Sequence, residues 1–584
     1  MTTSPTNLTS PTSLNSLTAL TRNPVQGPTK DRTQGPDLAP AVVWSIAGND
    51  SGGGAGLAAD LRAAQAFGVH LCPVVSAITA QNSEAVLSVV PMDAEWLDAQ
   101  LQALAQDLPP RAIKTGLLGG VAQIKVVARW VDRLREKGPL ALVVDPVLGS
   151  TSGTSFANQA VVQAYREWLL PRATLLTPNR REAMRLLGED QPPKPLDEPQ
   201  SPQSPQEPQW ARRLMAQGVQ AVCITGGDTD LAPGQSLDWL STPEASGWLS
   251  LPREATVHHH GTGCTFATSA ASALALGFVC ADAVVLAKMA TTHALRHAYP
   301  AGAGAGPVQA QSGFGNDPSL LPTLSWGAAE VTWQLPDEEP PLKQNQKQNQ
   351  NHNQKALGLY AVVDHLAWLK QVLDAGIRTV QLRIKAPLEP EAAWWHELNQ
   401  NIAQAVALAK EHGALLFIND HWRQALAQGA PAVHLGQEDL AAMTPEERQD
   451  LSASGLDLGI STHSLWELCR ARALLPRYIA CGPVWPTLTK AMPWLPQGLH
   501  NLAWWQQMAG CPVVAIGGIL SAEQVEQAAA CGVDGVAVVR AVQHDPAQGV
   551  PLLQAALEKG WALAKHHETE RQIFKPSLPK PSLA

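Results

Sequence analysis

The sequence predicts two α/β domains, at residues 39–325 and 356–565, and the second has the pattern of a (β/α)8 barrel. In the second region eight short apolar runs alternate with helix-like stretches, and strands that alternate with helices form parallel sheets. The first region opens with an apolar run, a glycine-rich turn and a helix-like stretch, a pattern that lets the backbone approach a ligand closely. A doubly wound sheet is the alternative architecture for the second region.

The chain has 584 residues, enough for two large α/β domains. Its 45% of hydrophobic residues can fill packed cores, and its 16% of charged residues argue against a mainly disordered chain. The formal net charge of −9 lacks the basic excess of nucleic-acid-binding proteins, so we expect small-molecule substrates and no nucleic-acid partner. Eight cysteines without a C-x-x-C pair indicate reduced thiols, as in the cytoplasm.

Four further segments are predicted from low complexity or their position. Residues 1–38 are rich in Thr, Ser, Pro and Asn and should be disordered, although an acid-poor, hydroxyl-rich start is also typical of an organelle transit peptide. Residues 191–209 predict an exposed insertion in the first domain, and residues 566–584 a C-terminal tail. Residues 326–355 read as a polar linker with no face for docking, so we expect the two domains to work independently.

The most apolar stretch runs from Cys264 to about Val285. Thr, Ser, Gly and Asp interrupt it, so it predicts a buried helix and not a membrane span. We therefore expect no membrane partner.

The eight predicted strands of the second domain follow one another in chain order. They begin at Leu357 (LGLYAVV), Thr379 (TVQLR), Ala414 (ALLFIN), Ala432 (AVHLG), Leu458 (LGIS), Tyr478 (YIACG), Val513 (VVAIGG) and Asp534 (DGVAVV). Polar residues follow nearly every strand, and the active site of a barrel lies at the carboxyl ends of its strands. Carboxylates there can hold Mg²⁺, while cations and glycine amides can hold phosphates, which predicts a site for two anionic ligands.

The motifs QLRIK, IND, HLGQEDL, GISTH, GPVWPTLTK and AIGGI occur in this order along the second domain. Together they resemble thiamine-phosphate synthase over the whole domain. The resemblance implies that hydroxymethylpyrimidine diphosphate condenses with a thiazole phosphate and releases pyrophosphate. The related thiazole tautomerases share the barrel but usually lack the full acidic and pyrophosphate-binding set, so the presence of Asp420 and Asp439 favours the synthase.

The resemblance also implies roles for single residues. The pyrimidine diphosphate is bound by Gln381, Leu382, Arg383, Ile384, Lys385 and Asn419. Asp420 and Asp439 hold Mg²⁺, and Lys490 acts on the leaving pyrophosphate as a catalytic residue. The rest of the substrate site, including the thiazole phosphate site, comprises Ser461, Thr487, Leu488, Thr489, Gly517, Gly518, Val539 and Arg540. Arg540 stands where the family commonly has a small Ser, and it either grips the phosphate or points to solvent while backbone amides hold the phosphate.

The first domain begins with AVVWSIAGNDSGGGAGLAADLRAAQAFG, and further motifs follow in order. They are TAQN, KTGLL, VVDPVLGSTSG, TPNRREA, ITGGD and HGTGCTFA. Together these segments resemble hydroxymethylpyrimidine/phosphomethylpyrimidine kinase, which has a ribokinase-like α/β fold. The resemblance implies two ATP-dependent phosphorylations, first of the hydroxymethylpyrimidine and then of its monophosphate.

The HGTGC segment precedes an Ala-rich helix. Gly261 and Gly263 therefore place free backbone amides at a helix N-terminus, which can bind the phosphoryl group during transfer. In the same field the pKa of Cys264 should be lowered, and Cys264 could then receive the proton of the substrate hydroxyl as a catalytic residue. A buried cysteine with a purely structural role is the alternative.

Other roles in the first domain follow from the same resemblance. The pyrimidine pocket is lined by Gly48, Asp60, Gln81, Leu117 and Val147. Asn179 and Glu182 match the nucleotide and Mg²⁺ region, to which Asp145 can contribute. The sequence departs from the family at Asn49, Leu117 and Asp228, and the last departure bears on the nucleotide contacts. We assign His260 to the motif and expect His258 and His259 at the surface.

The two resemblances fall on one pathway, because the first activity makes the diphosphate that the second consumes. We therefore expect a bifunctional enzyme of thiamine biosynthesis that uses ATP and Mg²⁺. The alternatives are a pyridoxal-type kinase fused to a tautomerase-like barrel, or a non-catalytic ligand-binding fusion that should have lost Asp420, Asp439, Lys490 or Cys264. Relatives of both kinds often form homo-oligomers, so we carry that expectation too.

Overall fold

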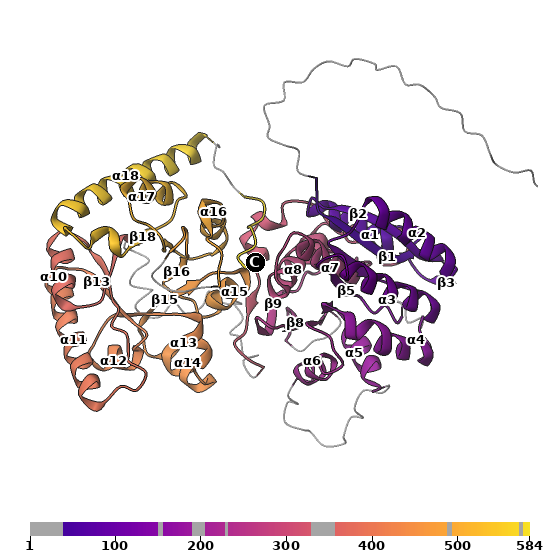
Figure 1. Cartoon of the computed structure of the whole chain (residues 1–584), viewed down its shortest axis with the longest axis horizontal. Helices are drawn as coiled ribbons and strands as arrows, with labels where there is room; N and C mark the ends of the chain where they lie inside the picture. Colours follow the sequence, from indigo (N-terminus) through magenta and orange to yellow (C-terminus); the bar gives the residue numbers. More distant parts are fainter. Residues whose placement is uncertain are drawn as a thin grey trace, which may run out of the picture. The chain divides into compact units, whose positions relative to one another are not determined.

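The structure is a computed structural model that describes residues 39–149, 156–189, 205–227, 232–328, 357–487, 493–570 and 576–583. Two α/β folds follow one another along the chain, in indigo to rose and in orange to yellow in Figure 1. The predictions for residues 1–38 and for most of the insertion and the linker lie outside the described residues.

The first domain is built on a ten-stranded sheet of order β10-β9-β8-β7-β6-β5-β4-β1-β2-β3. The strands are β1 Val42–Asn49, β2 His70–Gln81, β3 Val86–Pro91, β4 Ala112–Thr115, β5 Ala141–Val144, β6 Leu175–Leu176, β7 Val222–Ile224, β8 Gln235–Ser241, β9 Ser246–Pro252 and β10 Thr323–Leu324. Strands β7, β6, β5, β4, β1 and β2 pair in parallel, and the outer strands on both sides pair antiparallel. This is the α/β kinase sheet that the resemblance implies.

Both faces of this sheet are buried, because successive strand residues point to opposite sides. Val43 and Val143 belong to the apolar cluster that contains the last two helices of the domain, and Trp44 and Val144 belong to the cluster on the other face. The helices are α1 Gly56–Ala66, α2 Ala94–Asp107, α3 Val121–Arg135, α4 Gln159–Ala164, α5 Arg180–Leu187, α6 Glu207–Met215, α7 Thr262–Ala275 and α8 Cys280–Arg296. A central sheet with helices on both faces leaves the strand ends as the accessible edge.

The apolar stretch from Cys264 to Val285 is two helices and not one. Gly277 has a φ of +96°, and this left-handed conformation ends α7 before α8 begins at Cys280. Among the described residues, no helix is long and apolar enough to cross a membrane.

The second domain is a closed barrel of eight parallel strands, β11 to β18, in which β18 pairs with β11. The strands are β11 Gly358–Val363, β12 Thr379–Leu382, β13 Leu415–Asn419, β14 Ala432–Leu435, β15 Asp457–Thr462, β16 Tyr478–Cys481, β17 Val513–Ala515 and β18 Gly535–Val538. All eight predicted strands are confirmed, and the closed barrel excludes the doubly wound alternative.

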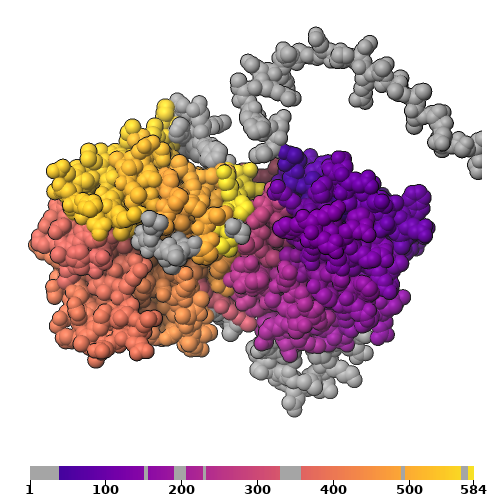
Figure 2. Space-filling view, viewed as in Figure 1, coloured from indigo at the N-terminus to yellow at the C-terminus, as the bar shows by residue number. Residues whose placement is uncertain are grey.

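Helices surround the barrel (Figure 1), which is coloured from salmon to yellow in Figure 2. They are α10 Leu366–Asp374, α11 Ala392–Glu411, α12 Trp422–Ala427, α13 Gln437–Ala442, α14 Pro445–Ala453, α15 Leu465–Ala473, α16 Gly498–Met508, α17 Ala522–Ala530 and α18 Pro546–Glu570. Inside, Tyr360, Phe417 and Tyr478 form a separate buried cluster that fills the barrel. Because all strands are parallel, their carboxyl ends meet at one end of the barrel.

Within the described residues the two domains contact each other, although the polar linker offers no docking face; that they work independently stays a prediction. Helix α15 of the barrel packs against α8 and β10 of the first domain. One apolar cluster continues through both domains, and residues 40–584 form one compact unit. The expectation considered only the polar linker, whereas the contact is made by surfaces of the two folded domains.

Candidate active sites

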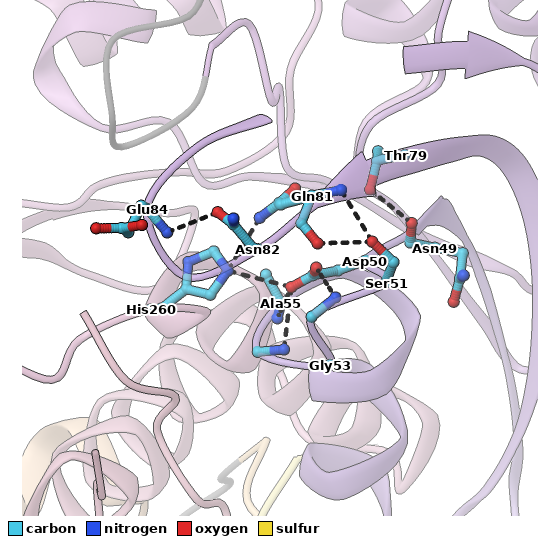
Figure 3. A network of polar contacts seen from close by, with 12 residues as sticks. Asn49, Asp50, Ser51, Gly53, Ala55, Thr79, Gln81, Asn82, Glu84 and His260 are labelled. Carbon is cyan, nitrogen blue, oxygen red and sulfur yellow. Dashed lines mark hydrogen bonds and ion pairs between the residues drawn. The ribbon is translucent and has the colours of Figure 1, made fainter. Parts of the chain in front are cut away.

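The glycine-rich turn of the first domain is organised by the carboxylate of Asp50, which follows β1 (Figure 3). Asp50 Oδ1 accepts a hydrogen bond from the N–H of Gly52 at 2.8 Å. Its Oδ2 accepts from the N–H groups of Gly54 at 3.0 Å and Ala55 at 2.8 Å, directly before α1. His260 Nε2 lies 3.1 Å from the same oxygen, so the HGTGC segment is tied to the turn.

The hydrogen bonds around Asp50 keep it ionised. Burial raises the pKa of Asp50, but the bonds from His260, Ala55 and Gly52 outweigh burial and hold the pKa below its usual range. Gln81 Nε2 lies 3.1 Å from His260 Nε2, so the imidazole ring links the end of β2 with the turn (Figure 3).

Two glycines let the HGTGC segment lie against the turn. A Cβ on Gly261, whose φ is +87°, would lie 2.2 Å from the carbonyl oxygen of Gly54. A Cβ on Gly54 would lie 2.3 Å from the ring of His260. Side chains do not pack at these distances, so both positions require glycine. The N-terminus of α7 therefore lies beside the glycine-rich turn, as an anion site at a helix start requires.

Four of the predicted pyrimidine-pocket residues lie at the carboxyl ends of strands that are neighbours in the order β5, β4, β1 and β2. Gly48 and Gln81 lie at the ends of β1 and β2, and Leu117 and Val147 follow β4 and β5. Leu117 packs on Gly48, where a Cβ would lie 3.2 Å from Leu117 Cδ2. Ligands of open α/β sheets bind at this edge, so the placement supports a shared pocket.

A fully buried lysine lies in β4, close to the same edge. Lys114 Nζ lies 3.0 Å and 3.1 Å from the two carboxylate oxygens of Asp60, and 3.8 Å from Oδ2 of Asp145. Asp60 also accepts hydrogen bonds from Ser45 Oγ at 2.5 Å and Thr268 Oγ1 at 2.7 Å. The Asp60 carboxylate is therefore occupied by donors of the protein itself, and its contact with the pyrimidine stays a prediction.

The thiol of Cys264 differs from its sequence-based expectation. Burial raises its pKa to about 12, and the carboxylates of Asp60 and Asp145 add to the effect, while Lys114 and the N–H of Gly56 oppose it. The predicted lowering of the pKa is therefore wrong, because burial and two carboxylates outweigh the positive groups. Cys264 is a neutral thiol at pH 7.

The predicted nucleotide residues form the start of α5. Asn179 Oδ1 accepts a hydrogen bond from the N–H of Glu182 at 2.9 Å, and Glu182 Oε2 accepts from the N–H of Asn179 at 3.0 Å. This capping box fixes the beginning of the helix. Asn179 also pairs with Thr225 in a parallel bridge, which brings the TPN and ITGG segments together. Asp228 lies outside the described residues.

In the barrel, six polar side chains from six strands form one chain of hydrogen bonds, which we call the polar chain. Its members in order are Ser461, His434, Tyr478, Tyr360, Gln381 and Asn419. The successive donor–acceptor distances are 2.8, 2.7, 3.0, 3.1 and 2.7 Å. The polar chain thus connects two predicted substrate-binding residues, Ser461 and Asn419, through the inside of the barrel.

The amide of Gln381 sets the direction of the polar chain. Its Nε2 donates to Asn419 Oδ1, so its Oε1 accepts from the hydroxyl of Tyr360. Each hydroxyl then accepts from the next member, and His434 donates through Nδ1 and accepts from Ser461 through Nε2. Asn419 keeps its Nδ2 donors for a ligand, and Ser461 keeps the lone pairs of its hydroxyl.

The charge state of His434 agrees with this direction. Burial lowers its pKa to about 4, and the nearby Arg383 and His463 add to the effect. The ring is neutral at pH 7, so one ring nitrogen donates and the other accepts.

The two predicted metal ligands lie at adjacent strand ends. Asp420 directly follows β13 with a φ of +63°, and Asp439 lies in the first turn of α13, which follows the neighbouring strand β14. Asp439 Oδ2 accepts the N–H of Gly436 at 2.9 Å. Paired carboxylates fit a hard cation such as Mg²⁺. The described part of the chain holds no cluster of three or more metal-ligating side chains, so the other ligands would be water and the diphosphate.

The predicted phosphate residues divide between described and undescribed parts of the chain. Gly517 and Gly518 have φ values of +92° and +74°, and a Cβ on either would lie within 2.7 Å of the backbone of Pro483 or Trp485. The turn after β17 therefore requires glycine and exposes backbone amides there. Val539 and the exposed Arg540 follow β18.

Other predicted substrate residues are placed as follows. Leu382 is buried in β12, Arg383 and Ile384 are partly buried after it, and Lys385 is exposed. Thr487 is the last described residue of its loop, and Leu488, Thr489 and Lys490 lie outside the described residues.

Two family models match the chain, phosphomethylpyrimidine kinase at residues 50–309 and thiamine monophosphate synthase at residues 359–542. A probable bifunctional thiamine biosynthetic enzyme of Oryza sativa subsp. japonica, described as chloroplastic, is 32% identical over 518 residues, which cover 86% of each chain. The chain belongs to this family of bifunctional thiamine biosynthetic enzymes. Its first domain is the kinase domain, and its barrel is the synthase domain.

Two further relatives each match one domain. Thiamine-phosphate synthase of Serratia proteamaculans is 48% identical over 196 residues, which cover 32% of this chain and 85% of that protein. A solved pyridoxal kinase of Bacillus subtilis in complex with ADP aligns with 47% of this chain and 98% of its own, at 30% identity and a TM-score of 0.41. The bifunctional relatives favour the kinase and synthase pair over a pyridoxal-type kinase with a tautomerase-like barrel and over a non-catalytic fusion.

The motifs do not single out several residues that the structure places at the two candidate sites. In the kinase domain these are Asp50 and Lys114, and a charged residue inside the apolar strand AIKT was the available signal for Lys114. In the synthase domain they are Tyr360, His434 and Tyr478, which point into the barrel. A polar side chain that interrupts a short apolar strand was the signal for all three.

Proposed function

We propose that residues 39–325 carry both phosphorylations and that residues 356–565 carry the condensation. The observation that supports this division is the gathering of the predicted polar and glycine residues at one sheet edge in each domain. Binding residues of parallel α/β folds lie at the carboxyl ends of strands.

In the kinase domain, the pyrimidine would lie against Gly48, Gln81, Leu117 and Val147. The γ-phosphoryl group of ATP would pass over the amides of Gly261, Gly263 and Cys264 at the start of α7. Phosphoryl transfer needs charge stabilisation and alignment more than a strong base. A neutral Cys264 thiol would therefore help to align the reacting oxygen by contacting it, and would not act as a base.

The kinase domain also has a candidate site for the Mg²⁺ that accompanies ATP. Asp145 is buried at the end of β5, and its Oδ2 has no hydrogen-bond partner among the described residues, although Lys114 Nζ lies 3.8 Å away. Burial raises the pKa of Asp145. A bound cation would supply the counter-charge, with Asn179 and Glu182 on the nucleotide side, so we propose Asp145 as its ligand.

In the synthase domain, Asn419 and Gln381 would hold the pyrimidine diphosphate, and the turn at Gly517 and Gly518 would hold the thiazole phosphate. Asp420 and Asp439 would hold Mg²⁺, and the bound ion would supply positive charge next to the leaving pyrophosphate. Lys490 would add a second positive group. The aminopyrimidine ring stabilises the carbon cation, so the residues act by stabilising the leaving anion rather than as a base.

One incubation tests the whole assignment. The full chain receives hydroxymethylpyrimidine, thiazole phosphate, ATP and Mg²⁺, and the products are separated by chromatography. The wild type should form thiamine phosphate, and Asp439→Asn should accumulate the pyrimidine diphosphate. Asp50→Ala should form much less of both products, yet should make thiamine phosphate at the wild-type rate when the diphosphate is supplied. A variant that loses the opposite activity would contradict the division of labour.

We also propose a cellular location and an oligomeric state for the enzyme. We propose a cytoplasmic enzyme, with an organelle as the alternative that the chloroplastic relative favours. Fusing residues 1–38 to a fluorescent protein in the source cell distinguishes the two. A homo-oligomer stays a prediction that sedimentation velocity tests.

A further inference from the structure

A carboxylate of the kinase domain caps a helix of the synthase domain. Asp282, in the first turn of α8, is 1% exposed, and its Oδ1 accepts the N–H of Trp466 at 3.0 Å. The N–H of Leu465 lies near the same carboxyl and acts to lower its pKa. These are the first two residues of α15, and helix starts leave such N–H groups without partners in their own helix. Ser464 accepts from Glu467, so Asp282 completes the cap.

The capped helix begins directly after the catalytic end of β15. Ser461, at the end of β15, is the first member of the polar chain. His463 follows, and its N–H and its Nδ1 lie 2.6 Å and 2.8 Å from Glu467 Oε2 in α15. The position of α15 therefore determines the position of the turn from Ser461 to Ser464.

A second set of hydrogen bonds links the same turn to the C-terminal tail. Gln497 Nε2 donates to the carbonyl oxygen of His463 at 2.7 Å, and Gln497 Oε1 accepts from Asn501 Nδ2 at 2.8 Å. Asn501 in turn exchanges two hydrogen bonds with the backbone of Lys580, at 2.7 Å and 3.0 Å. The tail and the kinase domain thus both brace one turn of the synthase site.

Two arginines of α15 fix this helix on the kinase domain. Arg470 donates to the carbonyl oxygen of Ser246 at 2.8 Å, and Arg472 donates to that of Leu321 at 2.6 Å. These contacts hold the helix at its other end. Asp282 is therefore the contact that acts at the end of α15 next to the synthase site.

We propose that Asp282 is a positioning residue for the synthase reaction, because it fixes the start of α15 and with it the turn that carries Ser461. The kinase domain then supplies part of the synthase's working geometry, in addition to its substrate. This inference rests on the proposed placement of the synthase site at this end of the barrel.

Three variants of the full chain test the proposal. Asp282→Ala removes the acceptor, Asp282→Asn keeps an oxygen that can accept the bond from Trp466, and Glu95→Ala removes an exposed carboxylate from the first turn of α2 as the matched control. Synthase kcat and KM are measured for each substrate, kinase kcat is measured on the same samples, and all rates are normalised to folded protein.

We expect Asp282→Ala to lower synthase kcat/KM about tenfold and to leave kinase kcat within twofold, since misplaced binding groups cost rate even when the fold is intact. Asp282→Asn and Glu95→Ala should stay within twofold in both activities. If Asp282→Ala is insoluble, Asp282→Ser should show the same split between activities, because its shorter side chain cannot reach the N–H of Trp466.

Two results would overturn the proposal. The first is a synthase kcat/KM within twofold of wild type in the soluble Ala or Ser variant. The second is a pattern of loss that the missing acceptor cannot explain. Such a pattern is an equal loss of kinase and synthase activity, or a synthase loss that is equal in Asp282→Ala and Asp282→Asn. Asp439→Asn, measured alongside, tests the site placement separately: full synthase activity there refutes the placement, whatever Asp282 shows.

Discussion

Replacing Asp50 with Ala should disable the kinase while leaving the synthase intact. The substitution removes the acceptor of the hydrogen bonds from Gly54 and Ala55, which are buried and part-buried, and from the exposed Gly52. A bond to a charged group contributes about 1.5 to 3 kcal/mol, and solvent replaces the one at Gly52. Two bonds at the lower value give about 3 kcal/mol, so we expect kinase kcat/KM to fall about a hundredfold.

The assay follows ADP release with hydroxymethylpyrimidine as substrate, and synthase activity on the same sample reports whether the chain is folded. Hydrogen exchange at Gly54 and Ala55 should speed up in the variant, because their amides lose their acceptor. Asp50→Asn should fall between wild type and Asp50→Ala, since its amide oxygen keeps part of the bonding. Kinase kcat/KM within threefold of wild type in Asp50→Ala would refute the assigned role of the turn.

Three further outcomes are expected. Because the pKa of Cys264 is raised to about 12, alkylation of this thiol by iodoacetamide should be slow at pH 7 and accelerate towards pH 10, as mass spectrometry can follow; fast alkylation at pH 7 would mean a thiolate. Asp439→Asn and Asp420→Asn should each lower synthase turnover about a hundredfold to a thousandfold at saturating Mg²⁺, with the double variant little worse, and kinase rates should not change. Burial raises the pKa of Asp282 from 3.8 to about 7, so the folded state binds this proton more tightly than the unfolded state does. The free energy of unfolding should therefore fall as pH rises between these values. In urea unfolding at pH 5 and pH 8, Asp282→Asn should show a smaller fall, and an unchanged fall would contradict the shift.

The sequence predicted the barrel well because its strands are short apolar runs that repeat regularly, and all eight begin within one residue of their predicted positions. Turn residues were equally readable, since Gly261, Gly517 and Gly518 are glycines for steric reasons that the motifs already carry. The pKa of Cys264 was not predictable, because it depends on burial in the folded domain and on Asp60 and Asp145, which are distant in sequence.

The contacts between the domains could not be predicted from the sequence either. Asp282 and Trp466 are 184 residues apart, and no local pattern marks a helix start that another domain will cap. The polar linker described only the connection between the domains, whereas the docking surfaces are ordinary helix faces in their own domains. The burial of Arg470 and the partial burial of Arg472 were hidden for the same reason, because both look like solvated helix residues in the sequence.

The hydrogen bonds of the polar chain all run in one direction, so its six side chains would act together when the site discriminates between pyrimidines. If the pyrimidine binds at this site as proposed, a ring that offers an acceptor to Asn419 and a donor to Ser461 would match both ends of the polar chain. A keto analogue with the opposite pattern would need the Asn419 amide to turn over, which would set two N–H donors against each other at Gln381. The mismatch could be removed only if Gln381, Tyr360, Tyr478 and His434 all reversed, with a change of tautomer at the imidazole. An analogue of this kind would be rejected in part by Tyr360, Tyr478 and His434, for which no contact with the substrate is proposed.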